Sequence, residues 1–151
     1  SRTEFMPTGN VTREQFVKML IIAFELENSD AECSFKDVDK DTWYYPYVAA
    51  AAECGLAKGD GENFGIGKYM SREEMAVFAY RAAEIAKIKL TEKNEAIDFV
   101  DSANIADYAK DAVSVMQKAG ILNGTDSNLF EPSVVCSRAM AAKVVYELLN
   151  I

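Results

Sequence analysis

The stretch YMSREEMAVFAYRA (residues 69–82) has the pattern of a helix start. Ser71 suits the N-cap position because its hydroxyl can accept a hydrogen bond from a first-turn amide, and Glu74 can complete a capping box. Arg72 is the unusual residue, because the helix dipole disfavours a cation in the first turn. Apolar residues then recur at helical spacing and form one stripe, made of Met75, Phe78, Ala79 and Ala82.

The same arrangement occurs three times. VTREQFVKML begins at Val11 and CSRAMAAKVV begins at Cys136, so the three copies carry Arg13, Arg72 and Arg138. These arginines are 59 and 66 residues apart, and the apolar stripes that follow them match. A repeat of this size indicates a chain built from similar structural units.

Each complete unit has the pattern of a helix, an irregular loop and a second helix. The second unit opens with FKDVDKDTWYYPY (residues 35–47) and continues with an alanine-rich helix that ends near Gly55, a residue that suits a left-handed helix stop. We expect the capped helix from Ser71 to run to about Leu90. No alternating apolar pattern of useful length is present, so the predicted fold class is mainly α.

The repeats divide the chain of 151 residues into four parts of one compact domain. Residues 1–6 match nothing later, and we interpret them as a cloning remnant or leader. Residues 7–30 are the back half of a first repeat, residues 33–90 a second repeat and residues 97–151 a third. The absent front half leaves an apolar helix over residues 16–24 without a partner, and we expect intramolecular packing or a second copy of the chain to cover it.

Composition excludes several classes of function. The net charge of −8 argues against binding to nucleic acid or to general anionic surfaces. No apolar run is long enough to span a membrane, and no signal peptide is visible. The chain has no histidine and no clustered nucleophile and base, so we expect neither an enzyme nor a cofactor.

Two further groups of residues have ordinary structural interpretations. The segment Asp37–Asp41 resembles the start of an EF-hand loop, but Thr42 and Val48 stand where glycine and glutamate are needed, so we expect no metal site. The three cysteines show no CxxC spacing, and we interpret two of them, Cys54 and Cys136, as small core residues. The sequence leaves a disulfide between Cys33 and Cys54 open.

Taken in order, these motifs resemble the S-layer homology (SLH) module. The family pattern is F-x-D-V with a downstream tryptophan, a helix ending in glycine and isoleucine or leucine, a glycine-containing loop, and a (V/I)-(T/S)-R-A-E helix. The second repeat matches it at Phe35, Asp37, Val38, Trp43, Gly55, Leu56 and Gly59. The helix motif is matched three times, at residues 11–14, 70–73 and 136–139.

The resemblance implies tandem helix-loop-helix SLH repeats packed as a pseudo-threefold helical bundle. It also implies an extracellular module of the bacterial cell surface or S-layer that binds secondary cell-wall polysaccharide, often pyruvylated, in Gram-positive-type bacteria. In the family, the basic residue of the helix motif contributes to the saccharide pocket. This chain departs from the pattern at Glu14 and Glu73, where alanine is usual, at Met140, a capping-box position, and at Ile105, near the place of the missing third-repeat tryptophan.

The residues themselves support a binding site for an anionic glycan. A helix N-terminus with free amides and a first-turn arginine suits a carboxylate, and glycine lets backbone approach a sugar. Trp43 can stack on a sugar face, although a core anchor is the more common role for tryptophan. The candidate binding residues are Thr12, Arg13, Glu14, Trp43, Gly59, Ser71, Arg72, Glu73, Gly124, Ser137 and Arg138.

The arginines also have a structural interpretation, in which they pair with neighbouring glutamates. We favour the binding role and predict that neutralising all three arginines abolishes cell-wall binding while the fold survives. The alternative function is a protein–protein assembly module of a surface protein, with self-association through the incomplete first repeat.

Overall fold

The computed structural model describes residues 6–151; residues 1–5, interpreted above as part of a remnant or leader, lie outside the described residues. Helices are the only extended regular elements of the described part, which confirms the mainly α fold. The α-helices are α1 (Arg13–Ala23), α2 (Tyr45–Glu53), α3 (Arg72–Ile85), α4 (Lys110–Lys118) and α5 (Arg138–Leu149). Two short 3-10 helices, η1 (Ser102–Asn104) and η2 (Asp107–Ala109), precede α4.

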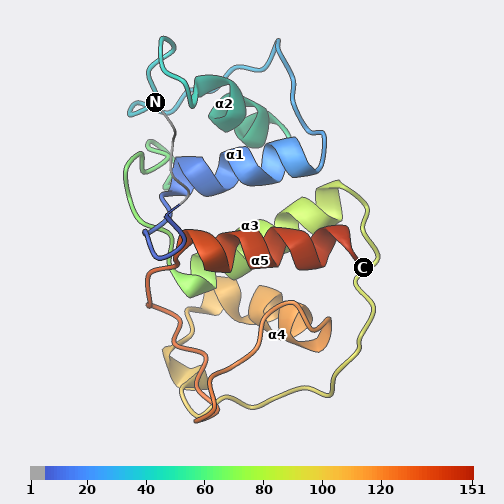
Figure 1. Cartoon of the computed structure of the whole chain (residues 1–151). Coiled ribbons are helices and arrows are strands. Elements are labelled where there is room, and N and C mark those ends of the chain that lie inside the picture. The colour runs from blue at the N-terminus through green and yellow to red at the C-terminus, as the bar shows by residue number, and fades with distance from the viewer. Residues whose placement is uncertain (1–5) are drawn as a thin grey trace.

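Helices α1, α3 and α5 form the centre of the molecule, and α2 and α4 lie at its two ends (Figure 1). The most extensive helix pairs are α1 with α2 and α3 with α4. The back-half helix of one repeat is therefore covered by the front-half helix of the next. Helix α1 buries Phe16, Val17 and Leu20 completely, so intramolecular packing covers the apolar helix that seemed to lack a partner.

Three backbone hydrogen bonds join the starts of the central helices in a closed ring. The amide of Val11 donates to the carbonyl of Cys136 at 3.0 Å, Cys136 donates to Met70 at 2.8 Å, and Met70 donates to Val11 at 2.9 Å. All three side chains are buried. Each repeat thus donates one backbone hydrogen bond and accepts one, which is the pseudo-threefold arrangement expected from the repeats.

The N-terminal caps of α3 and α5 follow the sequence pattern. Ser71 Oγ accepts from the amide of Glu74 at 3.3 Å, and Glu74 Oε2 accepts from the amide of Ser71 at 3.0 Å. Ser137 Oγ accepts from the amide of Met140 at 3.2 Å. The Met140 sulfur takes the glutamate's place as a weak acceptor, 3.5 Å from the Ser137 amide.

The end of α3 differs from the prediction. The helix ends at Ile85 rather than near Leu90, because Lys87 adopts a left-handed conformation with φ of 57° and the amide of Ile88 bonds back to the carbonyl of Ala83 at 2.8 Å. No glycine marks this stop in the sequence. At Gly55 the predicted left-handed stop is confirmed, with φ of 83°.

The three cysteines are free thiols, so the disulfide that the sequence left open between Cys33 and Cys54 is not formed. Cys136 is fully buried beside the ring of helix starts, as expected for a core residue, whereas Cys54 is only partly buried. Among the helices of residues 6–151, none combines the length and apolar character that a membrane span requires.

One aspartate in each complete repeat holds the loop that precedes the arginine helix. The carboxylate of Asp37 accepts from the amides of Phe64, Gly65 and Ile66 at 2.7, 2.7 and 2.9 Å. In the third repeat the carboxylate of Asp101 accepts from the amides of Phe130 and Glu131, both at 2.7 Å. Burial alone raises the pKa of each carboxyl, but the amide hydrogen bonds outweigh it and leave the pKa below the ordinary value. The segment that resembled an EF-hand is therefore a loop clamp.

We predict that Asp37→Asn lowers the free energy of unfolding by about 2 kcal/mol at pH 7, because the loop amides lose a charged acceptor. The pKa of Asp37 is lower in the folded protein than its ordinary value of 3.8, so the charged carboxylate stabilises the fold. This stabilisation is fully present above pH 3.8 and is lost as the pH falls through the pKa of the folded protein. The difference between variant and parent in urea unfolding should therefore shrink below pH 4. Asp126→Asn, at an exposed position, is the control, and an equal effect there would contradict the clamp.

Candidate functional site

Three surface grooves occupy equivalent places in the repeats. Each is lined by the first-turn arginine of one repeat and by the back-half helix of the following repeat in the ring. We name them after their arginines: the Arg13 groove of about 350 Å³, the Arg72 groove of about 200 Å³ and the Arg138 groove of about 370 Å³. The grooves thus bring together residues from repeats that are distant in sequence.

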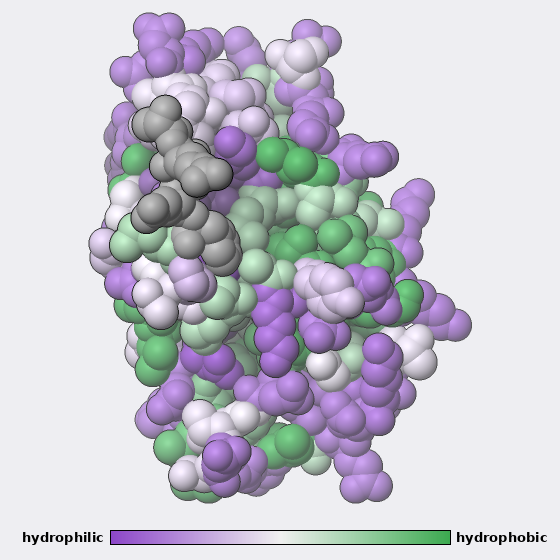
Figure 2. Space-filling model, viewed as in Figure 1, coloured by the Kyte–Doolittle hydropathy of each residue, from purple (hydrophilic) through white to green (hydrophobic). Residues whose placement is uncertain are grey.

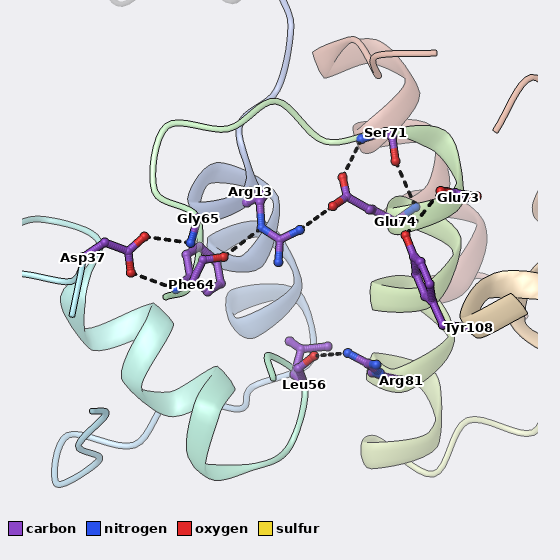
Figure 3. A network of polar contacts seen from close by, with 10 residues as sticks. All are labelled: Arg13, Asp37, Leu56, Phe64, Gly65, Ser71, Glu73, Glu74, Arg81 and Tyr108. Atoms are coloured by element: carbon purple, nitrogen blue, oxygen red, sulfur yellow. Dashed lines mark hydrogen bonds and ion pairs between the residues drawn. The ribbon is translucent and has the colours of Figure 1, made fainter. Parts of the chain in front are cut away.

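Arg13 is held firmly between two repeats (Figure 3). Its Nε donates to the carbonyl of Phe64 at 3.0 Å, and a terminal nitrogen contacts Glu74 Oε1 at 2.6 Å. The guanidinium lies 5.3 Å from the ring centres of both Phe64 and Phe78, and only 13% of the side chain is exposed. Arg13 is therefore a clamp between repeats, and its charge is compensated by Glu74 of the next repeat rather than by a glutamate neighbouring in sequence.

Two other cations line the Arg13 groove, Lys58 and Arg81. Arg81 donates to the carbonyl of Leu56 at 3.3 Å. Burial, and then the charge of Arg13, lower the pKa of Arg81, so this guanidinium lies in surroundings that would favour an added anion. Within the described residues neither Lys58 nor Arg81 forms an ion pair.

Tyr108 forms another wall of the Arg13 groove and is fixed by Glu73. The Tyr108 hydroxyl donates to Glu73 Oε1 at 3.3 Å, and the amide of Ala106 donates to Oε2 at 3.0 Å. Burial, followed by the charges of Glu73 and Glu74, raises the pKa of Tyr108 to about 12, so the phenol stays neutral. Glu73 itself positions the third repeat and does not line the groove.

Glu14 has a similar structural role in the first repeat. Its carboxylate accepts from the amide of Gly67 at 3.1 Å, and the residue is only 7% exposed. Gly59 lies in the Arg13 groove, but a Cβ there would be 2.3 Å from the carbonyl of Asn63 and 2.6 Å from Phe35. The glycine is therefore required for the loop to pack on Phe35, whatever the groove binds.

In the Arg72 groove, Arg72 connects two repeats as Arg13 does, but it bonds only to backbone carbonyls and not to a carboxylate. Arg72 Nε donates to the carbonyl of Phe130 at 2.8 Å, and Nη2 donates to the carbonyl of Asn123 at 3.0 Å. Within the described residues Arg72 has no acidic partner in an ion pair. Gly124 and Lys143 complete the groove, and a Cβ on Gly124 would lie 2.7 Å from a ring carbon of Phe99.

The Arg138 groove contains the tryptophan of the chain. Trp43 lines it and is 52% exposed, so this residue does not have the core-anchor role that is more common for tryptophan. Its ring packs edge-on against Tyr44 at 5.5 Å, and the Lys18 ammonium lies 5.4 Å from its centre.

The helix N-termini do not offer the free amides that the sequence suggested. The amides of the three arginines donate to loop carbonyls of the next repeat at 2.8–3.0 Å: Arg13 to Lys68, Arg72 to Val134, and Arg138 to Gly9. Glu73 and Ala139 donate likewise, to Pro132 and Pro7. The positive charge at these helix starts therefore comes mainly from side chains.

The cap residues close the helices and do not line the grooves. The hydroxyl oxygens of Ser71 and Ser137 accept hydrogen bonds from the amides of Glu74 and Met140, three residues later in each helix. The amide of Thr12 donates to Gln15 Oε1 at 3.1 Å, while Thr12 Oγ1 is buried with no hydrogen-bond partner in the part of the chain that the structure describes.

The grooves add cations that sequence reasoning missed. Lys18 and Lys143 each lie five residues after an arginine, a recurring spacing that could have indicated them, whereas Arg81, nine residues after Arg72, has no counterpart in the other repeats. With the lysines and arginines counted against the single acid, Glu74, the residues lining each groove sum to a formal charge of +2. The chain as a whole carries −8. Three equivalent positive grooves on an acidic protein are the features of a binding module built from helical repeats.

Comparison with known proteins identifies the family. The model of the S-layer homology domain matches residues 34–76 and 98–142, and the chain belongs to this family. S-layer homology domains are non-catalytic modules that anchor S-layer proteins and cell-surface enzymes to the bacterial cell wall. The family thus places the chain at the cell surface.

The similar proteins include both enzymes and S-layer proteins. The chain is 35% identical over 98% of its length to "Exoglucanase XynX" of Acetivibrio thermocellus and 36% identical over 99% to "Endoglucanase" of Bacillus sp. (strain KSM-635). It is 28% identical over 93% to "S-layer protein" of Bacillus thuringiensis subsp. finitimus. The chain spans only 14%, 16% and 17% of these relatives.

We predict that Arg13→Gln lowers the free energy of unfolding by about 2–3 kcal/mol, because it leaves the Phe64 carbonyl and the Glu74 carboxylate without their partner. This expectation replaces the one drawn from sequence, in which neutralising the arginines left the fold intact. Urea unfolding followed by circular dichroism measures it. Lys36→Gln, which breaks an ion pair whose side chains are both 67% exposed, should change stability by less than about 1 kcal/mol. Equal effects of the two substitutions would refute the clamp.

Proposed function

We propose that the chain anchors its protein non-covalently to an anionic secondary cell-wall polysaccharide, with the Arg13 groove as the principal site. The observation that carries this proposal is the charge of +2 from the lining residues of each groove on a chain of net charge −8. Surface charges more than about 8 Å apart are largely screened at physiological salt, so the local cations dominate what an anionic group meets in a groove.

The Arg13 groove supplies complementary contacts for a charged sugar. The planar guanidinium of Arg81 can bind a carboxylate through two hydrogen bonds, and Lys58 adds a second positive charge. Val77 and Phe78 offer an apolar floor for the carbon face of a sugar ring, while the neutral hydroxyl of Tyr108 lies at the wall. A pyruvyl ketal, which joins a carboxylate to a sugar, fits this combination.

The other two grooves have different chemistry. The exposed ring of Trp43 makes the Arg138 groove suitable for stacking on a sugar face, with Lys18 and Arg138 beside it. The Arg72 groove is smaller and offers Arg72, Lys143 and the loop at Gly124. A polymer with charged and uncharged sugars can therefore engage more than one groove, which raises the overall affinity without further contacts.

We predict that the double variant Lys58→Gln/Arg81→Gln loses at least about tenfold in affinity for sacculi that carry their secondary polymer, equal to about 1.4 kcal/mol. Sedimentation of the protein with sacculi measures the affinity, and sacculi stripped of the polymer by acid give the background. Lys36→Gln, an exposed cation outside the grooves, is the matched control. Unchanged binding in a folded double variant would refute the role of these two cations.

We also predict that binding of the released polymer changes the fluorescence of Trp43, the only tryptophan of the chain. Half of this side chain is in water, so a sugar stacked on it should shift the emission to shorter wavelength. Fluorescence titration measures the change, and Trp43→Phe should bind several-fold more weakly. A titration that reaches saturation by sedimentation without any change in emission would exclude Trp43 from the site.

A further inference from the structure

Asn123, in the loop after α4, is the only asparagine of the chain that is followed by glycine. An asparagine side chain can react with the amide nitrogen of the next residue, and Gly124, which has no Cβ, leaves that nitrogen unshielded. The segment between α4 and α5 runs along the lower end of the molecule in the view of Figure 1, and Figure 2 shows many hydrophilic residues at this end. Asn123 itself is exposed, so water and hydroxide reach it.

The two groups that would react are free of competing hydrogen bonds within residues 6–151. There Asn123 accepts a hydrogen bond at its backbone carbonyl, while its side chain forms none and the Gly124 amide donates to no acceptor. The side-chain nitrogens of three other asparagines donate to protein oxygens instead, which restrains them: Asn28, Asn94 and Asn128. The fold therefore leaves the Asn123 side chain able to approach the next amide.

Arg72 places a positive charge on the peptide group that joins Asn123 to Gly124. Its Nη2 donates to the carbonyl oxygen of Asn123 at 3.0 Å. When the Gly124 amide loses its proton, the negative charge is shared between the nitrogen and this oxygen, because both atoms belong to one conjugated peptide group. A donor already positioned where charge develops lowers the barrier to reaction. The contact that joins two repeats thus also activates the attacking nitrogen.

We infer that Asn123 is a site of spontaneous deamidation, promoted by Arg72, that changes the charge of the Arg72 groove. Hydroxide takes the proton of the Gly124 amide, whose nitrogen then forms a bond to Cγ of Asn123. The bond from Cγ to Nδ2 breaks, and that nitrogen leaves as ammonia with a proton from water, which restores the hydroxide. The product is a cyclic imide, the succinimide.

One water molecule then opens the succinimide in one of two ways. Cleavage of the bond from the Gly124 nitrogen to Cγ gives aspartate, and cleavage of its bond to the main-chain carbonyl carbon gives isoaspartate. In isoaspartate that carbonyl carbon carries the free carboxylate, at the oxygen that Arg72 already contacts. Because Arg72 polarises this carbonyl, the contact favours the attack of water there and hence isoaspartate.

Either product changes the electrostatics of the Arg72 groove, which Asn123 lines. Arg72 and Lys143 contribute two positive charges and the new carboxylate one negative charge, so the formal charge of the lining residues falls from +2 to +1. In isoaspartate the carboxylate pairs directly with Arg72, as Glu74 pairs with Arg13. The consequence for polymer binding, a weaker hold on an anionic chain, rests on the proposed function.

The chemically similar pair Asp60–Gly61 of the second repeat is protected by its hydrogen bonds. The carboxylate of Asp60 accepts from the amides of Asn63 and Glu62 at 2.7 and 2.9 Å. These bonds lower the pKa of Asp60, and an ionised carboxylate resists attack by an amide nitrogen. The structure therefore singles out Asn123 from the two glycine-flanked candidates.

Mass spectrometry of the aged protein tests the inference. The intact chain is incubated at mildly alkaline pH and digested with trypsin, which releases residues 119–138 as one peptide that contains Asn123 and Asn128. Fragmentation by electron transfer locates the exchange of NH2 for OH and separates isoaspartate from aspartate. Asn128, exposed in the same loop, is the internal control. Arg72→Gln removes the donor, and a synthetic peptide of residues 119–129 presents the Asn–Gly pair without it.

We expect Asn123 to convert at least about tenfold faster than Asn128, and to give a larger share of isoaspartate than the synthetic peptide does. Arg72→Gln should slow the conversion at least about threefold, because the charge on the attacking peptide group loses its donor. Conversion at Asn123 that is no faster than at Asn128 would overturn the inference. So would an unchanged rate in a folded Arg72→Gln variant or, if that variant does not fold, slower conversion in the intact chain than in the peptide.

The effect on binding is measured separately. Converted and unconverted protein are resolved by ion exchange and compared by sedimentation with sacculi that carry their secondary polymer, with Asn123→Asp as the reference for the aspartate product. We expect the converted protein to bind more weakly. Conversion without any change in binding would leave the modification site established and exclude the Arg72 groove from the proposed function, so the two failures are distinguishable.

Discussion

The backbone ring of Val11, Met70 and Cys136 is the constraint on which the rest of the molecule depends. Its hydrogen bonds join positions 59, 66 and 125 residues apart, and each segment both donates and accepts. A buried amide or carbonyl left without a partner is destabilising, so no repeat can leave the ring without exposing or orphaning groups of the other two. The repeats therefore form one cooperative unit, although the second and third each have their own helix pair.

The ring also determines which backbone groups at the helix starts are already hydrogen-bonded. It brings each helix start against the loop of a neighbouring repeat, and that loop takes up the first-turn amides that would otherwise attract an anion. Arg13 and Arg72 then extend along the same loops and bond to the carbonyls of Phe64 and Phe130. The motif arginines thus connect repeats, and under the proposed function recognition would fall to side chains such as Lys58 and Arg81 that line the grooves.

Much of this fold could be predicted from sequence because its signals are local. The cap at Ser71, the stop at Gly55 and the recurring arginine each depend on a few neighbouring residues. The end of α3 could not be predicted, since Lys87 adopts a left-handed conformation that its residue type does not favour.

The site was less predictable than the fold because it depends on contacts between repeats. The exposure of Trp43 is set by α1, and the pairing of Arg13 with Glu74 joins residues 61 positions apart. Sequence spacing correctly placed Arg13, Arg72 and Arg138 in three equivalent positions, and Gly59 and Gly124 beside two of them. It could not show that the caps Thr12, Ser71 and Ser137 face away from the grooves, since that follows from the ring.

The three grooves differ in composition but share the same formal charge. The third position of the back-half helix is Gln15 in one groove, Glu74 in another and Met140 in the last, so only the Arg13 groove contains a carboxylate. That same groove has one additional cation, because Lys58 and Arg81 take the place of the single lysine found in each of the others. The added positive charge offsets the added negative one, and every groove keeps a formal charge of +2. This shared charge, which the clamp role of Arg13 and Arg72 does not require, is the property on which the proposed binding of an anionic polymer rests.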